Sequence, residues 1–211
     1  WSLFNNEKIL NAAKKLLNNN SIYFIPHTDV QINAKGGIFH RDSAERNFPY
    51  GNVWKEKEDK YGVLRIAVYL SSYKKSNSSL FFLENSNYFE SKLKKLEIKI
   101  YNKLRVFFNK YNIQIPHFNF FSKLIKIKFN PGDVVLFDQR LIHAGGNINY
   151  SEPKISLFFG LGLKNKHTIN HIEWLKNANK KQKENQGSEY YILDFNKEFQ
   201  NFLKDNKLFI L

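Results

Sequence analysis

Two short segments, far apart in this 211-residue chain, limit its possible folds more than any other feature. In the first, His40 and Asp42 are two residues apart, so on an extended strand both side chains point to the same face. In the second, a turn at 130–133 leads into the apolar run Val134–Phe137, which predicts a buried strand ahead of His143. Together the two segments offer two imidazoles and one carboxylate for one site.

That set of side chains favours a specific chemistry. Two His and one carboxylate that leave neighbouring coordination positions open form the facial triad that suits non-haem Fe(II) enzymes handling oxygen. A bidentate 2-oxo acid can take two of the open positions and dioxygen the third. The far carboxylate of such an acid needs a fixed positive charge in an apolar barrel, and Lys154, soon after His143, is the candidate.

Most other strands are predicted by alternation or by short apolar runs between turn residues. These runs cover 22–25, 29–33, 63–70, 80–83, 125–129 and 154–161, with Pro26 ending the first. A helix is predicted at 6–20, capped by Asn5 or Asn6. The strongest helical pattern lies between 89 and 111, where apolar side chains recur every three or four residues. Further helices within 165–187 and 193–208 are expected outside the β core.

A polar stretch over 43–61 has no clear period and directly follows the first two candidate ligands. A loop this long is usually functional or disordered, so a substrate-covering lid with aromatic contacts stands against a mobile surface excursion. Four cations lie in or beside this stretch and favour an anionic small-molecule substrate. They are Arg41, Arg46, Lys55 and Lys57.

The composition suits a single domain over residues 1–211, with a β core at about 22–163 and a helical segment at about 165–211. The absence of Cys excludes a disulfide scaffold and favours a reducing compartment, so we expect a cytoplasmic protein. No apolar run approaches a membrane span and nothing at Trp1 resembles a signal peptide, so no membrane partner is expected. Because the chain does not begin with Met, we expect that an N-terminal portion is missing.

The net charge of +14 could attract nucleic acid, anionic membranes or acidic substrates. The lysines are scattered through the predicted helices and strands rather than gathered in one run. They also accompany abundant Asn, Ile and Phe, which is typical of an A/T-biased genome. A solvated basic surface is therefore the preferred interpretation, and nucleic acid is not expected as a partner.

Several segments between about residues 23 and 163 resemble the phytanoyl-CoA dioxygenase-like branch of the Fe(II)/2-oxoglutarate-dependent oxygenases. They are Phe39–Ser43, Arg65–Leu70, Ser79–Ser86, Pro131–Asp138, and Leu141–His143 with Lys154–Leu157. The resemblance implies a mainly β fold with flanking α-helices, built as a double-stranded β-helix (jelly roll, cupin-like). It also implies that His40, Asp42 and His143 bind iron. Lys154 occupies the position of the family's basic residue, usually Arg, that binds the 2-oxoglutarate C5 carboxylate.

Departures from the family pattern refine this expectation. An ammonium at Lys154 lacks the bidentate fork of a guanidinium, so it would hold the carboxylate with looser geometry. The segment Glu84–Asn87 replaces the Gly-rich, Gly-Ser-His-like ending common in the family, which affects lid and substrate contacts. Asp42 is retained, whereas halogenating relatives have a small residue there, so hydroxylation is favoured over halogenation.

Three more residues are candidates to contact the cosubstrate: Tyr69 and Arg65, on a strand that would line the barrel, and Ser156. The leading hypothesis is a dioxygenase that hydroxylates a small or carrier-linked metabolite. It would use Fe(II), dioxygen and 2-oxoglutarate, which it decarboxylates to succinate. Two alternatives stay open: a non-catalytic jelly-roll module that binds metal or ligand, and a nucleic-acid-directed oxygenase of the same superfamily.

The remaining histidines receive plainer interpretations. His167 and His171 are four residues apart and could share a metal on a helix, but no third ligand is evident, so they are expected to be solvated. His27 and His117 each adjoin a proline and have no visible partners in the sequence.

Overall fold

The structure, a computed structural model, describes residues 3–34, 36–42, 60–88, 91–121, 123–147, 151–186, 197–205 and 209–210. Apart from its last two residues, the predicted lid over 43–61 lies outside the described residues, as do Arg46, Lys55 and Lys57. The helix predicted within 193–208 is described as a helix over 197–205.

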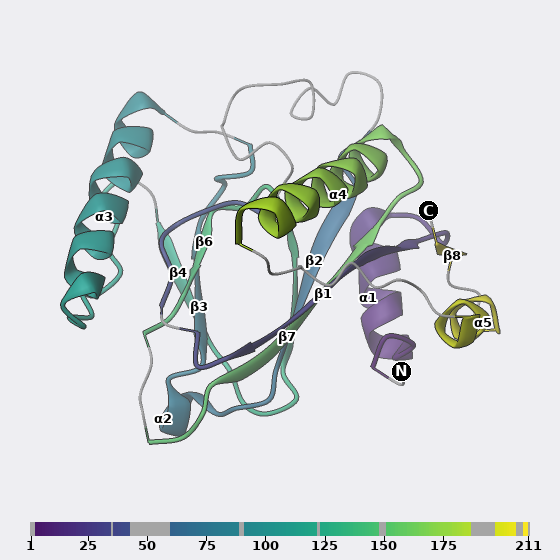
Figure 1. The fold of residues 1–211 in the computed structure, drawn as a ribbon, viewed down its shortest axis with the longest axis horizontal. Coiled ribbons are helices and arrows are strands. Elements are labelled where there is room, and N and C mark those ends of the chain that lie inside the picture. The colour runs from purple at the N-terminus through teal and green to yellow at the C-terminus, as the bar shows by residue number, and fades with distance from the viewer. Residues whose placement is uncertain are drawn as a thin grey trace.

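Two sheets form the centre of the molecule (Figure 1). Their strands are β1 Tyr23–Ile32, β2 Val63–Tyr69, β3 Ser79–Leu83, β4 Leu124–Lys128, β5 Val134–Asp138, β6 His143–Gly145, β7 Ile155–Gly162 and β8 Phe209–Ile210. Among the described residues, one sheet has the order β5-β2-β7-β1-β8 and the other β4-β3-β6. All pairs are antiparallel except β1 with β8. The chain passes repeatedly from one sheet to the other, which is the predicted double-stranded β-helix.

Helices flank the sheets, as expected. They are α1 Glu7–Leu17, α2 Tyr73–Ser76, α3 Lys92–Lys110, α4 Lys166–Gln186 and α5 Lys197–Asp205. Asn6 caps α1 as predicted, since its side chain accepts hydrogen bonds from the amides of Lys8 and Ile9. Helices α1 and α5 pack against the larger sheet, whereas α3 lies at the outer edge of the molecule, beside the smaller sheet (Figure 1).

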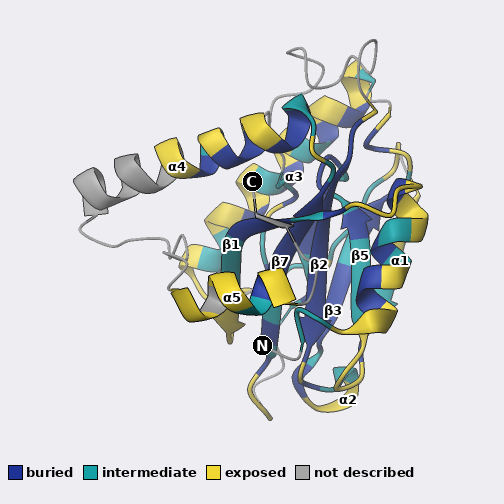
Figure 2. Cartoon of the chain, turned by 90° about the vertical axis from the view of Figure 1, so that its right-hand side faces the viewer, coloured by how far each residue is buried: buried dark blue, intermediate teal, exposed yellow. Residues whose placement is uncertain are grey.

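Strand β2 is buried along its whole length, as its dark blue colour in Figure 2 shows. On one face, Ile66 and Val68 pack in a cluster with α1. On the other face, Ala67 and Tyr69 pack with aromatic residues of both sheets. Because side chains alternate along a strand, Arg65 shares this inner face with Ala67 and Tyr69. The sequence therefore turns Arg65 and Tyr69 toward the interior between the sheets.

The structure corrects two predictions about strands. Pro26 does not end a strand: β1 runs through it, and the pairing of β1 with β7 shifts register between Ile25 and Thr28. A bulge of this kind tolerates proline because the local ladder is interrupted there. The segment 36–42 forms no regular strand either, and its one β-bridge joins His40 to His143.

Helix α3 forms within the predicted range, but its burial differs from that of an ordinary amphipathic helix. The apolar side chains at intervals of three and four, which we call the α3 stripe, are each between 41% and 64% exposed. The stripe consists of Leu93, Leu96, Ile100, Leu104, Phe107 and Tyr111. The residues that α3 buries are Lys94, Glu97, Tyr101 and Arg105. An amphipathic helix normally turns its apolar stripe to the core, so the facing of α3 is reversed.

Candidate metal centre and cosubstrate cavity

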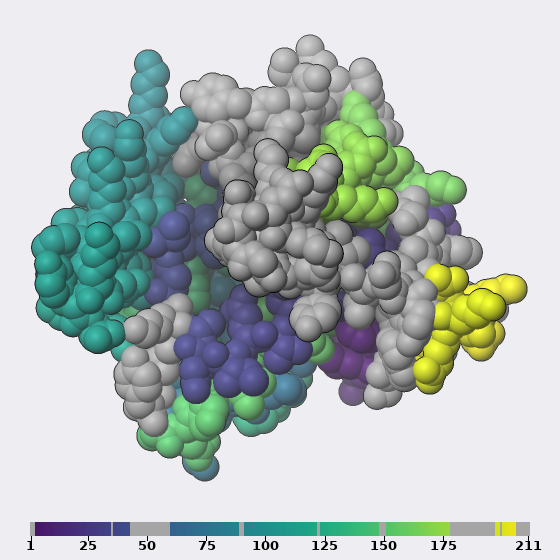
Figure 3. Space-filling view, in the orientation of Figure 1, coloured from purple at the N-terminus to yellow at the C-terminus, as the bar shows by residue number. Residues whose placement is uncertain are grey.

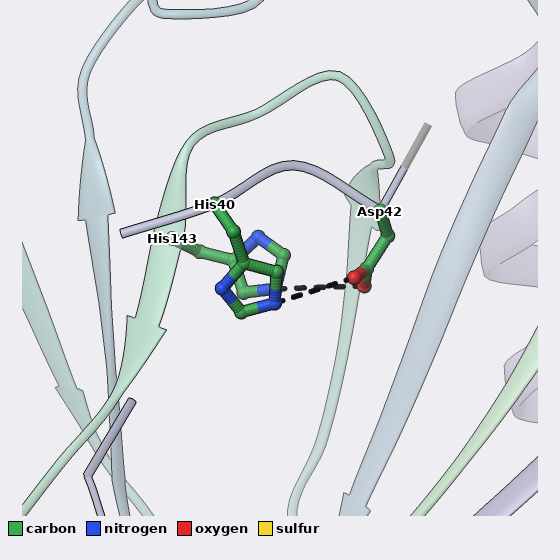
Figure 4. A group of neighbouring side chains, drawn as sticks. All are labelled: His40, Asp42 and His143. Carbon is green, nitrogen blue, oxygen red and sulfur yellow. Dashed lines mark ion pairs between the residues drawn. The ribbon is translucent and has the colours of Figure 1, made fainter. Parts of the chain in front are cut away.

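The side chains of His40, Asp42 and His143 point toward one another at the start of β6 (Figure 4). Nε2 of His40 lies 3.4 Å from Oδ1 of Asp42, and Nε2 of His143 lies 3.4 Å from Oδ2 of the same carboxylate. The three residues offer ligand atoms that all lie within 4.8 Å of one another. The structure thus brings together the three residues that the sequence analysis singled out as metal ligands.

Main-chain hydrogen bonds hold the two ligand-bearing segments side by side. The amide of His40 donates to the carbonyl of His143 over 3.0 Å, and the amide of His143 donates back over 2.9 Å. The Asp42 amide donates to the Gln139 carbonyl, which lies directly after β5, over 3.1 Å. These bonds fix the backbone from which all three side chains project, although the first two ligands lie outside any regular strand.

Both imidazoles are oriented by a carbonyl two residues earlier in the chain. Nδ1 of His40 lies 2.9 Å from the carbonyl oxygen of Ile38, and Nδ1 of His143 lies 3.0 Å from that of Leu141. Since a carbonyl oxygen can only accept, each Nδ1 must carry the proton. Each Nε2 therefore carries a lone pair on the side that faces Asp42, which is the state in which a histidine binds metal.

The spacing of these atoms fits a first-row transition metal. Adjacent corners of an octahedron with metal–ligand distances of about 2.1 Å are about 3 Å apart. The two observed imidazole–carboxylate distances of 3.4 Å exceed that value by only a few tenths of an ångström. Three ligands on one face of an octahedron leave the opposite face open. Among the described residues, His40, Asp42 and His143 form a group whose ligand atoms lie close enough together to hold a metal ion.

The ionisation states also suit metal binding. Burial would raise the pKa of Asp42, but the polar and cationic groups around it, among them the guanidinium of Arg65, outweigh burial and hold the pKa well below its usual value. Burial lowers the pKa of His143 to about 4, although Asp42 opposes this change. At neutral pH the carboxylate is therefore ionised and the buried imidazole is neutral, so both can donate electron pairs to a cation.

Arg65 lies beside the carboxylate of this site. Its Nε is 3.7 Å from Oδ2 of Asp42, and the rest of its guanidinium contacts the carboxylate of Asp29 and, over 3.1 Å, Nδ1 of His27. Arg65 Nε is buried without a hydrogen-bond partner among the described residues. These contacts make Arg65 a support for the carboxylate of the candidate ligand Asp42. A direct contact with a cosubstrate stays a prediction.

A cavity of about 800 Å³ opens next to the three candidate ligands. Its lining includes all four residues predicted to contact the cosubstrate, namely Lys154, Ser156, Tyr69 and Arg65. Tyr69 and Ser156 lie opposite one another in the pairing of β2 with β7. Burial raises the pKa of Tyr69, so its hydroxyl stays protonated and can donate a hydrogen bond at neutral pH.

Lys154 is almost completely buried in this cavity, at 5% exposure. Its ammonium donates to the carbonyl of Gly146 over 3.2 Å, which uses one of its three N–H groups. Burial, with a smaller effect from the charge of Arg105, lowers the pKa of Lys154 to about 8. The side chain is therefore still mainly a cation at pH 7, and it can donate to a carboxylate that enters the cavity.

Several cavity residues were missed by the sequence analysis. His27 does have a partner: its Nε2 lies 3.1 Å from Oδ1 of Asp29, in a His-x-Asp pair on β1 that repeats the spacing of His40 and Asp42. His171 is buried rather than solvated, and it stacks on Trp174 in the cavity wall. The spacing of His27 and Asp29 was the available signal, but the expected strand break at Pro26 hid it.

Arg41, expected to favour an anionic substrate, serves the fold instead. It is 5% exposed, and its guanidinium donates to the carbonyls of Arg140 and Ser86. His117 likewise has partners, since its ring lies 2.6 Å from the hydroxyl of Tyr101 and 2.9 Å from the carbonyl of Gly145. His167 is 1% exposed and belongs to the interior, not to a solvated surface.

Solved structures share this fold. No protein-family profile matches the chain, and no curated protein matches it. The crystal structure of EvdMO1 superposes with a TM-score of 0.52 at 14% identity, over 78% of this chain and 32% of that one. AviO1 from Streptomyces viridochromogenes Tue57 gives 0.50 at 13% identity, over 77% and 60%. SnoK, a non-haem α-ketoglutarate-dependent carbocyclase from nogalamycin biosynthesis, gives 0.50 at 10% identity, over 76% and 57%.

These identities are low, so the likeness concerns the fold. The chain spans between 32% and 60% of the length of the three structures. One of them is described as a non-haem α-ketoglutarate-dependent carbocyclase. The expected oxygenase superfamily and the narrower resemblance to its phytanoyl-CoA dioxygenase-like branch both rest on the sequence motifs.

Proposed function

We propose that this protein is an Fe(II)- and 2-oxoglutarate-dependent dioxygenase that hydroxylates a small or carrier-linked metabolite. The observation that carries the proposal is the geometry of His40, Asp42 and His143, with both Nε2 atoms 3.4 Å from one carboxylate and both Nδ1 atoms tied to carbonyls. These three residues would bind Fe(II). The bound metal would supply the activation of dioxygen that accompanies decarboxylation of 2-oxoglutarate to succinate.

In this proposal, the inner end of the cavity binds the cosubstrate. Lys154 supplies the positive charge for the C5 carboxylate, and its burial strengthens that attraction because water does not screen it. The Tyr69 hydroxyl and Ser156, on neighbouring strands, supply further hydrogen bonds to the same carboxylate. Arg65 keeps Asp42 ionised and oriented toward the metal.

The substrate would enter from the part of the cavity farther along β1 and α4. Thr28–Gln31 of β1 and His171, Trp174 and Leu175 of α4 line the cavity as well. This wall offers an aromatic face together with polar groups, which suits a small organic molecule. Since Arg41 is committed to backbone carbonyls, the described residues no longer favour an anionic substrate over a neutral one.

Two measurements on the purified protein test the proposal. Fe(II) and 2-oxoglutarate added without oxygen should produce a visible metal-to-ligand charge-transfer band, and His143→Ala should abolish it. In air, the wild-type protein should form succinate from 2-oxoglutarate, even slowly and without its own substrate. A band without any succinate would favour a non-catalytic binding module, and absence of the band would refute the proposed cosubstrate.

A further inference from the structure

The α3 stripe is a large apolar surface for a folded protein. Six large apolar side chains, each about half exposed, present an area on the order of 500 Å², comparable with the largest patch of a typical monomer, roughly 300–600 Å². Patches of this size commonly mark interaction sites. Figure 3 shows that α3 forms an outer edge of the molecule, where such a site would be accessible.

Two aromatic residues extend the stripe on one side. Phe120 is 82% exposed and Phe121 is 56% exposed. Their amides donate to the carboxylate of Glu97, which lies four residues after Leu93 and seven before Leu104, in the helix row next to the stripe. The two phenylalanines therefore continue the apolar surface beyond the helix itself.

Lysines follow the stripe on its other side. Lys92, Lys99, Lys103 and Lys110 are spaced seven, four and seven residues apart, so they share one row of the helix, and all are exposed. The only acidic residue of α3 is Glu97, which is buried and occupied by the two amides. The helix thus presents positive charge and apolar side chains to the solvent, and no negative charge. We call the stripe, Phe120, Phe121 and this lysine row the α3 surface.

The exposed stripe is not needed to attach α3 to the protein. Arg105, which is fully buried, donates to the carbonyls of Gly36 and Ile115, and Asn102 exchanges two hydrogen bonds of 2.9 Å with the backbone of Phe39. The residues that the structure describes thus leave the apolar face exposed, so it can bind a partner, and the charge beside it selects the kind of partner.

We propose that the α3 surface binds an anionic lipid membrane, with the helix lying in the plane of the interface. Apolar side chains on one face and lysines beside them are the pattern of interfacial helices, in which the apolar face enters the acyl boundary and the cations meet lipid phosphates. All the exposed cations of α3 are lysines, which are compact charges without the rigid fork that suits a defined carboxylate or phosphate pair. This favours mobile headgroups over a folded acidic partner.

A second copy of the chain fits this surface less well. Antiparallel pairing of two α3 helices through their stripes would bring each lysine row against its own copy, and each chain carries a net charge of +14. The expectation of no membrane partner was based on the lack of a spanning segment. No described helix is long and apolar enough to cross a membrane. An interfacial helix needs no such length, so the two statements are compatible.

Vesicle flotation of the purified full chain tests the proposal. The probes are vesicles of phosphatidylcholine alone and vesicles with 30% phosphatidylserine, at 50, 150 and 500 mM NaCl. Binding should occur on the anionic vesicles, weaken as salt rises, and be at least tenfold weaker on the neutral ones. Because the chain has no Cys, a fluorophore on Ile100→Cys can report insertion by a blue shift, with Leu16→Cys on α1 as the control site.

Two lysine variants distinguish vesicle binding through the α3 surface from binding driven by the net charge of the protein. Replacing Lys92, Lys99, Lys103 and Lys110 by Gln should weaken vesicle binding at least tenfold. The matched control makes the same change in net charge elsewhere, by replacing four lysines of α1 and α5 by Gln: Lys8, Lys15, Lys197 and Lys204. This control variant should weaken vesicle binding less than threefold. Leu96→Glu with Phe107→Glu should also abolish binding, with an unchanged melting temperature because both side chains are exposed.

Three outcomes would overturn the proposal. Equal losses for the two lysine variants would show that net charge, not α3, drives binding. No binding to anionic vesicles at 50 mM NaCl would exclude the membrane. A dimer in sedimentation analysis that dissociates in the Leu96→Glu, Phe107→Glu variant would show that a second copy covers the stripe. None of these results depends on whether the protein binds iron or 2-oxoglutarate.

Discussion

Strand β2, beside the candidate metal centre, and helix α3 differ in how well their sequence patterns predict which side chains are buried. On β2, alternating side chains lie on alternating faces, and the residues expected to face the cavity do so. On α3, the pattern predicts the helix correctly, yet the apolar stripe is exposed and Lys94, Glu97 and Arg105 are buried. A periodic pattern therefore identifies an element more reliably than it identifies the side that packs.

The reason lies in the segment that α3 covers. Residues 36–42 carry two candidate metal ligands but form no regular strand, so their backbone groups need partners other than a ladder. Asn102 pairs with the amide and carbonyl of Phe39, and Arg105 donates to the carbonyl of Gly36. An apolar helix face would leave these buried groups unsatisfied. The polar side of α3 faces inward because the irregular segment requires it.

The largest expected effect concerns the metal centre. Asp42→Ala removes the only carboxylate of the triad and should weaken Fe(II) or Mn(II) binding by more than about 100-fold, beyond the 10–100-fold effect of losing a residue that only orients a ligand. Anaerobic calorimetric titration measures this affinity. Asp29→Ala, in the matched His-x-Asp pair of β1, should cost at most about tenfold. Equal losses of metal affinity in the two variants would contradict the assignment of Asp42 as a metal ligand and of Asp29 as a supporting residue.

The buried polar face of α3 should contribute strongly to stability. Arg105→Met keeps a long side chain but leaves the carbonyl of Gly36 without its donors and that of Ile115 with only the Asn147 amide, and should lower the free energy of unfolding by about 3 kcal/mol. Urea denaturation measures the change. Lys103→Met, an exposed cation on the same helix, should change it by less than about 0.5 kcal/mol. A small effect at Arg105 would mean that α3 is not held by its polar side.

Cosubstrate binding should depend on pH through Lys154. The pKa of this side chain is lowered to about 8, so the cation is present below that pH and is lost above it. The dissociation constant of 2-oxoglutarate should therefore rise by about tenfold between pH 7 and pH 9. Isothermal titration of the metal-loaded protein tests this. Lys154→Arg should remove the dependence, since a guanidinium does not titrate in this range; a flat wild-type profile would exclude Lys154 as the anion's partner.

The smallest effect is expected on the exposed stripe. Leu96→Ala should change the free energy of unfolding by less than about 0.5 kcal/mol, because the side chain is already half exposed. Ile66→Ala, in the fully buried strand β2, should cost about 2–5 kcal/mol. Chemical denaturation of both variants makes the comparison direct. A cost above 1 kcal/mol at Leu96 would indicate that the stripe is covered in the isolated protein.

The jelly roll was predicted through the resemblance to a known family. The convergence of His40, Asp42 and His143 was predicted from the types and positions of these residues in their motifs, and the structure brings the three side chains together. The sequence did not predict the bulge at Pro26, since a register shift is set by the pairing partner β7 and not by β1 alone. The cavity lining by His171 and Trp174 was also beyond the sequence, because nothing in a helical pattern states where the helix docks.

One consequence follows from the hydrogen bonds between α3 and residues 36–42. Helix α3 carries the exposed apolar stripe on one side. On its other side, Asn102 and Arg105 hydrogen-bond the backbone of the segment that carries His40 and Asp42. A displacement of α3 would therefore also displace the segment that carries the candidate ligands His40 and Asp42, because the hydrogen bonds join the helix directly to its backbone.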